Sequence, residues 1–220
     1  MISHRFKCVY VHIPKTGGQS IESVFVEQHG LTWETRAPLL LRPCTDRRFG
    51  PKFLAHLTAA EYVTLGHLSP QDWDEYFTFG SIRNPWDRML STYRYLNPDD
   101  VSFPSWLTTT ARRRFEKGHY FFRSQADYLC DHEGRVIVDH VVMLEDFPDA
   151  FDAVRERLHI PGSGLPRVNV SPHQPTLTPE AVYDSETEEF VADMYARDLA
   201  LWHYDPPSAR STSTLRTEER

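Results

Sequence analysis

The segment Tyr10-Val-His-Ile-Pro-Lys-Thr-Gly-Gly-Gln-Ser-Ile21 decides how the first part of this chain folds. It starts inside a run over residues 6–13 that is rich in aromatic and β-branched residues, which predicts a buried strand. Pro14 ends that strand, and apolar residues then recur at helical spacing, which predicts a helix over 18–29. The segment is therefore expected to fold as a strand, a tight turn and a helix.

The turn has the composition of an anion-binding site. Gly17 and Gly18 allow backbone angles that other residues avoid, and the first amides of a helix have no acceptor within it. The helix dipole favours negative charge at the same end, and Lys15 adds a mobile cation. Alternatively, the proline and the glycines only form the turn between the strand and the helix, without binding an anion. The residues expected to hold a phosphate are Thr16, Gly17, Gly18, Gln19 and Ser20.

The position of the lysine separates this turn from the P-loop of nucleoside triphosphatases. That motif places Lys and Ser or Thr directly after the last glycine, whereas Lys15 precedes both glycines. Most of the 24 basic residues are arginine, so a compact ammonium group at the turn indicates a point contact with one oxygen.

A second strand-turn-helix unit lies at Phe79-Gly-Ser-Ile-Arg-Asn-Pro-Trp-Asp-Arg-Met-Leu-Ser-Thr-Tyr93. Residues 76–82 predict a strand, Asn84 is suited to cap the next helix, and Pro85 fits its first turn. That helix is expected over 85–96, with an apolar stripe on one side.

Arg83 comes where this strand ends, and Ser91 lies about two helical turns further on. The two side chains are therefore candidates to bind one anion. Taken singly, Arg83 is more typical of a surface salt bridge with Asp87, and Ser91 of a solvent-facing residue.

Together the two segments resemble the phosphosulfate-binding loop and the 3′-phosphate-binding motif of sulfotransferases that use 3′-phosphoadenosine 5′-phosphosulfate (PAPS). The resemblance covers residues 5–205 and is closest to the carbohydrate branch, which includes heparan sulfate 2-O-sulfotransferases and many small bacterial enzymes. It implies in-line transfer of the sulfuryl group of PAPS to a hydroxyl acceptor, most simply on a carbohydrate, without a metal ion.

Carried over by position, the resemblance implies that Lys15 contacts the oxygen that bridges the sulfuryl group and the 5′-phosphate. Residues 16–20 would hold that phosphate, and Arg83 with Ser91 would hold the 3′-phosphate. A cation and fixed donors at the bridging oxygen stabilise the charge that grows there in the transition state. No Cys or His pair has zinc-finger spacing, so no metal site is expected.

A hydroxyl acceptor needs a base, and neutral histidine suits that role near pH 7. We expect this base to be His56, because a histidine in this region acts as base in related carbohydrate enzymes. His67 is the next candidate, and a carboxylate is a further alternative. His12 is expected to be a packed, hydrogen-bonded strand residue. The rate should then rise through a pKa near the ordinary histidine value.

The alternation of strands and helices predicts a single α/β domain over 1–205 with a mainly parallel central sheet flanked by helices. The resemblance implies the P-loop-like nucleotide-binding fold of sulfotransferases. Residues 136–144 predict one or two more strands, and 185–202 a long final helix. Residues 206–220 have the composition of a disordered tail.

Composition narrows the functional classes. A net charge of −7 argues against nucleic-acid binding. The sequence contains neither a signal-peptide core nor an apolar run long enough to span a membrane, which predicts a cytoplasmic protein, and a bacterial one.

Three functional classes stay open: a PAPS-dependent sulfotransferase, a nucleotide or small-molecule kinase, and a non-catalytic binder of nucleotides or anionic glycans. The misplaced lysine disfavours the kinase. The sequence leaves the acceptor and the oligomeric state undecided.

Overall fold

The computed structural model describes residues 1–96, 101–147, 149–166, 168 and 177–210. The chain divides into two compact units. The first consists of Met1–Ile82 and Gln125–Asn169, and the second of Arg83–Ser124 and Val170–Arg220.

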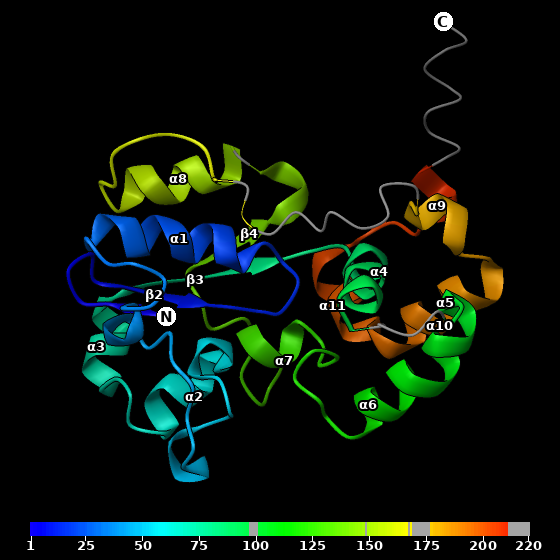
Figure 1. Ribbon diagram of the computed structural model, residues 1–220, viewed down its shortest axis with the longest axis horizontal. Helices are drawn as coiled ribbons and strands as arrows, with labels where there is room; N and C mark the ends of the chain where they lie inside the picture. The colour runs from blue at the N-terminus through cyan, green and yellow to red at the C-terminus, as the bar shows by residue number, and fades with distance from the viewer. Residues whose placement is uncertain (97–100, 148, 167, 169–176, 211–220) are drawn as a thin grey trace, which may run out of the picture. The chain divides into compact units, whose positions relative to one another are not determined.

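The first unit is built on a four-stranded sheet in the order β1-β2-β3-β4 (Figure 1). Its strands are β1 (Ile2–Ser3), β2 (Cys8–Val11), β3 (Phe77–Ile82) and β4 (His140–Met143). The short β1 pairs antiparallel with β2, whereas β2, β3 and β4 are mutually parallel. This arrangement confirms the predicted α/β class with a mainly parallel sheet.

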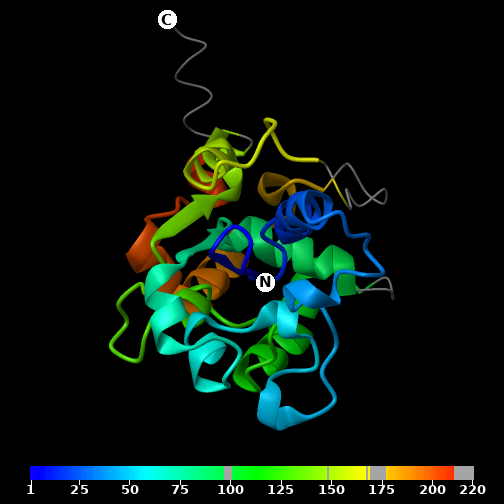
Figure 2. The same cartoon turned by 90° about the vertical axis from the view of Figure 1, so that its left-hand side faces the viewer.

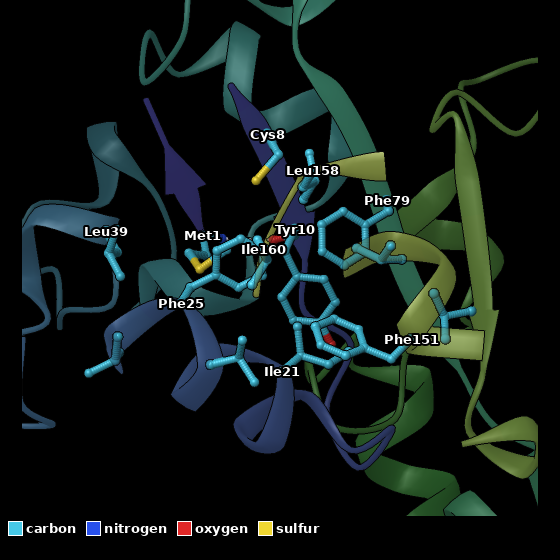
Figure 3. Packing of buried hydrophobic residues seen from close by; sticks show 14 of the residues in the cluster. Met1, Cys8, Tyr10, Ile21, Phe25, Leu39, Phe79, Phe151, Leu158 and Ile160 are labelled. Carbon is cyan, nitrogen blue, oxygen red and sulfur yellow. Dashed lines mark hydrogen bonds between the residues drawn. The ribbon is translucent and has the colours of Figure 1, made fainter. Parts of the chain in front are cut away.

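One face of the sheet is covered by α1 (Gly18–Gln28) and α8 (Asp149–Arg157) (Figure 1). Successive strand residues point to opposite faces, so Cys8 and Tyr10 of β2 share this face with Phe79 of β3. They form one buried cluster with apolar residues of the two helices (Figure 3). This cluster fixes α1 against the sheet and thereby fixes the turn that precedes it.

The opposite face carries α2 (Ala59–Thr64), α3 (Pro70–Glu75) and α7 (Ala126–Leu129), and the turned view separates α1 from α2 and α3 (Figures 1 and 2). A Cβ atom at Gly80 would lie 2.5 Å from a methyl group of Leu129, so glycine is needed for α7 to approach β3. Short 3-10 turns connect these parts at Ala37–Leu39, Arg47–Phe49, Leu54–His56 and Leu144–Asp146.

The second unit is helical in the part that the structure describes. Its elements are α4 (Pro85–Leu96), α5 (Phe103–Trp106), a π-helical turn (Leu107–Ala111), α6 (Arg112–Glu116), α9 (Pro179–Val182), α10 (Ser185–Met194) and α11 (Ala196–Trp202). They enclose a separate aromatic-rich core that includes Trp86, Trp106 and Tyr195.

Two expected elements differ from the structure. The strand predicted over 6–13 is shorter, because its main-chain pairing with β3 ends at Val11. The single helix predicted over 185–202 is two helices, because the backbone of Tyr195 leaves the helical region with φ −117° and ψ 28°. Tyr195 is buried and its hydroxyl donates to the carbonyl of Phe122. The break between α10 and α11 therefore coincides with the tertiary hydrogen bond from Tyr195 to Phe122.

Part of the expected tail makes contacts. Ser208 donates to Glu188, and Arg210 pairs with Asp87 at 2.8 Å. Residues 211–220 of the predicted tail lie outside the described residues. Among the residues that the structure describes, no helix is both long enough and apolar enough to cross a membrane.

Candidate active site

The candidate anion site lies where β2 ends and α1 begins. β2 ends at Val11, and residues 12–17 lead to the first helical residue, Gly18. Because β2 and β3 are parallel, this turn lies at the edge of the sheet where both strands have their carboxyl ends. Such edges are the usual ligand sites of open α/β sheets.

The backbone of the turn has the form of an anion-binding concavity. Lys15 has φ +71° and Gly17 has φ +80°, whereas Thr16 between them does not have a positive φ. An alternating sign of φ is typical of anion-binding concavities, in which successive amides point toward a common centre. A non-glycine residue in the left-handed region costs about 1–2 kcal/mol, so the fold holds Lys15 in a strained conformation.

Close packing, in addition to backbone freedom, explains the two glycines. A Cβ atom on Gly17 would lie 2.7 Å from Leu144, which follows β4. One on Gly18 would lie 2.3 Å from the imidazole of His12, although the φ of Gly18 is not positive. The turn is therefore pressed against both neighbours, and a side chain at either position would displace it.

Thr16 is fixed by a buried chain of hydroxyl groups. Its Oγ1 donates to the carbonyl of Ile13 at 2.9 Å and also lies 2.8 Å from Oγ of Ser81 on β3. Since the Thr16 proton is used on Ile13, Ser81 must donate to Thr16, and the hydroxyl of Tyr10, at 2.6 Å, must donate to Ser81. Burial raises the pKa of Tyr10, which keeps this donor protonated.

His12 and Glu22 form a buried pair beneath the start of α1. Nδ1 of His12 lies 2.6 Å from Oε1 of Glu22, and the two residues are 6% and 3% exposed. Burial opposes ionisation of Glu22, but the charge of and hydrogen bond from His12 outweigh it and hold the pKa of Glu22 below its ordinary value. The expectation that His12 is packed and hydrogen-bonded is confirmed, but His12 lies one residue beyond β2 and not within a strand.

His56 lies directly against His12. Its Nδ1 is 3.0 Å from the backbone oxygen of His12, and the two rings meet edge to face with centroids 4.6 Å apart. A carbonyl oxygen only accepts hydrogen bonds, so Nδ1 of His56 carries the proton and Nε2 is the acceptor nitrogen of the neutral ring.

The pKa of His56 is lowered to about 3. Desolvation by the surrounding protein is the larger cause, and the charge of the neighbouring His12 is the next. A rate that rises with pH near the ordinary histidine pKa is therefore not expected for His56 in the ligand-free protein. The neutral form of His56 therefore prevails at neutral pH.

His67 lies elsewhere in the first unit. It follows α2, and its Nε2 lies 2.6 Å from the carbonyl oxygen of Phe49. Unlike His56, it has no described hydrogen bond to the turn between β2 and α1.

Gln19 and Ser20 are the second and third residues of α1, and both are partly exposed. The amide of Ser20 donates to the carbonyl of Gly17 at 3.0 Å, which closes the first turn of the helix. Its hydroxyl accepts from the amide of Val168 at 3.4 Å.

Arg83 and Ser91 belong to the second unit, and both are partly exposed. Asn84 caps α4 as predicted, because its Oδ1 accepts from the amide of Trp86 at 3.1 Å. Its amide group donates to the carbonyl of Asp205, which anchors the residue next to Arg83. Ser91 lies on α4 itself, so one rigid helix carries it.

Sequence reasoning missed two residues that support the turn, Glu22 and Ser81. A signal existed for each: Glu22 interrupts the apolar face of a predicted helix, and Ser81 interrupts a predicted buried strand. Among the residues that the structure describes, no group of three or more His, Cys, Asp or Glu side chains is arranged to hold a metal ion.

One protein family is similar to this chain over most of its length. A family model described as the sulfotransferase family matches residues 1–205. Comparisons with curated proteins and with solved structures gave no match. A match over nearly the whole chain, across both motifs, shows that this protein belongs to the sulfotransferase family.

Proposed function

We propose that this sulfotransferase uses PAPS as donor and a carbohydrate hydroxyl as acceptor. The observation that supports the donor assignment is the backbone of Lys15, Thr16 and Gly17, where φ alternates in sign directly before α1, as in anion-binding concavities. A concavity of this kind suits a phosphate group, and the cation of Lys15 comes from the same turn.

PAPS would supply an activated sulfuryl group joined through a bridging oxygen to the 5′-phosphate. Residues 16–20 would hold that phosphate, with Ser20 acting through its hydroxyl because its amide donates to the carbonyl of Gly17, and Lys15 would neutralise charge at the bridging oxygen. Arg83 and Ser91 would hold the 3′-phosphate, an assignment that rests on the resemblance of their segment to the 3′-phosphate motif. The guanidinium group of arginine suits a phosphate because it donates two parallel hydrogen bonds.

His56 would act as the general base. In its neutral form the proton stays on Nδ1, bound to the carbonyl of His12, so Nε2 takes the proton of the acceptor hydroxyl. Desolvation and the neighbouring His12 disfavour the imidazolium that results, and the negative charge of Glu22 offsets part of this cost. The pair therefore supplies both a base and a counter-charge.

The segment that leads to His56 supports a carbohydrate acceptor. Phe49 and Phe53 are 53% and 40% exposed, with the cations of Arg48 and Lys52 over their rings. Exposed aromatic rings offer flat apolar faces to sugar rings, and the cations suit any acidic groups on them. This segment lies in and just beyond the stretch over 30–52, which is irregular in sequence as an acceptor loop would be.

The test is calorimetric titration with 3′-phosphoadenosine 5′-phosphate (PAP), AMP and ATP, followed by assay of sulfuryl transfer from PAPS to a panel of glycans. PAP should bind at least about tenfold more tightly than AMP, because two charge-assisted hydrogen bonds are worth about 1.5–3 kcal/mol each. Mass spectrometry should detect added sulfate on a glycan. Equal affinity for PAP and AMP would refute the 3′-phosphate assignment, and phosphate transfer from ATP would indicate the kinase instead.

A further inference from the structure

Glu22 is a buried carboxylate one turn beyond Gly18 on α1. Only 3% of the residue is exposed, and a buried carboxylate is costly unless it is paired. Its partner is Nδ1 of His12 at 2.6 Å. An ionised carboxylate only accepts hydrogen bonds, so His12 donates, and this bond sets the orientation of the His12 ring.

The ring of His12 is also confined by packing. A Cβ atom at Gly18 would lie 2.3 Å from its Nε2 atom, so the ring abuts the first residue of α1. The ring of Tyr10 stacks on it with centroids 5.8 Å apart. The His12 ring is thus confined to one position by Glu22, Gly18 and Tyr10.

In this position His12 contacts His56 through two groups. Its main-chain oxygen accepts from Nδ1 of His56 at 3.0 Å, and its ring meets the His56 ring at an interplanar angle of 65°. In the other tautomer of His56, the lone pair of Nδ1 would face the carbonyl oxygen, and Nε2 would carry a proton and accept none.

We propose that Glu22 is a positioning residue for sulfuryl transfer. Glu22 fixes His12, and through His12 it holds His56 in the tautomer whose Nε2 accepts a proton. The inference rests on the proposed role of His56 as base. Its chemical content is that a side chain on α1 holds in place the residue whose main-chain oxygen fixes the basic nitrogen of His56.

The test compares Glu22→Met, Glu22→Gln and the matched control Glu27→Met. Met keeps the approximate volume of Glu and removes the acceptor, whereas Gln keeps an acceptor oxygen and removes the charge. Glu27 is exposed on the same helix. The measurements are the 15N chemical shifts of the His56 ring nitrogens, the dissociation constant of PAP, and kcat for sulfuryl transfer.

In Glu22→Met, the shifts should report a mixture of His56 tautomers, and kcat should fall about 100-fold, the usual effect of a small misplacement of a reacting group. Glu22→Gln should keep the wild-type tautomer and lose about tenfold in kcat, because it removes the counter-charge but retains the hydrogen bond. PAP affinity should change less than about threefold in both variants, because backbone amides and Lys15 bind the phosphate. Glu27→Met should match the wild type throughout.

Wild-type tautomer and wild-type kcat in Glu22→Met would overturn the proposal. Should that variant not fold, the tautomer in Glu22→Gln decides: a mixture of His56 tautomers refutes the positioning role, because Gln retains the acceptor for His12, and the wild-type tautomer with a kcat lowered no more than about tenfold supports it. A wrong assignment of the base can be distinguished from a wrong role for Glu22. If His56 is not the base, His56→Gln retains kcat, whereas the 15N shifts in Glu22→Met report the tautomer independently of turnover.

Discussion

Thr16 in the anion-binding turn and Ser81 on β3 share a side-chain hydrogen bond of 2.8 Å, so the turn is attached to a strand that is distant in sequence. Ser81 in turn accepts from Tyr10 on β2. The three hydroxyl groups connect both central strands to the turn that would hold the phosphate. The conformation of Lys15 and Gly17 is therefore maintained from beneath by polar contacts within the core.

Removal of the central hydroxyl should loosen the turn. Ser81→Ala leaves Tyr10 and Thr16 without their shared partner and should lower the free energy of unfolding by about 1–3 kcal/mol, with weaker binding of PAP. Urea denaturation and calorimetry measure the two effects. Ser23→Ala, which removes a hydroxyl that bonds the Ser20 carbonyl on α1, is the control. Identical PAP affinity in Ser81→Ala and wild type would show that the hydroxyl chain does not shape the turn.

A methyl group at Gly18 should be more damaging than one at a spacious glycine. Gly18→Ala forces the new carbon into the ring of His12, and such overpacking costs about 1–3 kcal/mol of unfolding free energy. Gly30→Ala has open space but a left-handed φ of +66°, so it should cost about 1 kcal/mol from backbone strain alone. Only Gly18→Ala should also weaken PAP binding. A normal PAP affinity in Gly18→Ala would argue against contact between His12 and the phosphate turn.

Lys15 should affect turnover more than ground-state binding. Lys15→Ala should reduce kcat by about 100-fold or more, because the cation acts where negative charge grows in the transition state. The affinity for PAP should fall much less. Lys7→Ala is a matched control, since Lys7 also has a positive φ, +45°, but precedes β2 at its opposite end. Normal kcat in Lys15→Ala at saturating PAPS would remove the lysine from the chemical step.

Arg83 should show the reverse behaviour. Arg83→Ala should weaken PAP by at least about tenfold through the loss of charge-assisted hydrogen bonds, while AMP, which has no 3′-phosphate, should bind as before. Arg112→Ala is the control, because Arg112 is an exposed arginine of the same unit whose partner is Glu116. A parallel loss of PAP and AMP affinity in Arg83→Ala would contradict a specific 3′-phosphate contact.

The partly buried position of His56 should appear in the acid stability of the protein. The fold lowers the pKa of His56 to about 3, whereas an unfolded histidine takes up its proton near pH 6.5. Between these values the unfolded chain binds more protons, so the free energy of unfolding decreases as the pH falls from about 6.5 toward 3.

His56→Gln should reduce this loss of stability between pH 7.5 and pH 5, as measured by urea denaturation. His132→Gln changes a histidine whose side chain is 88% exposed and should leave the pH dependence as in the wild type. The same pH dependence in His56→Gln and wild type would mean that the fold does not keep His56 neutral.

The sequence predicted the elements that depend on local signals. The helix over 85–96 was predicted with the bounds that the structure gives, because Asn84 and Pro85 mark its start and an apolar stripe marks its length. The helix Pro70–Glu75 was missed, although Ser69 accepts from the amide of Asp72 as an ordinary N-cap. Its six residues are too few to produce a recognisable apolar period.

The sequence by itself determined the α/β class, the two motifs and the sulfotransferase resemblance, because strand pattern, glycines and caps act over a few neighbouring residues. Only the tertiary structure decided which side chains support the turn. Glu22, His12 and His56 meet because strand alternation points His12 toward α1 while the chain before α2 returns to the carbonyl of the same residue. The tautomer of His56 and its lowered pKa follow from burial and from that one carbonyl, and both depend on contacts between residues far apart in sequence.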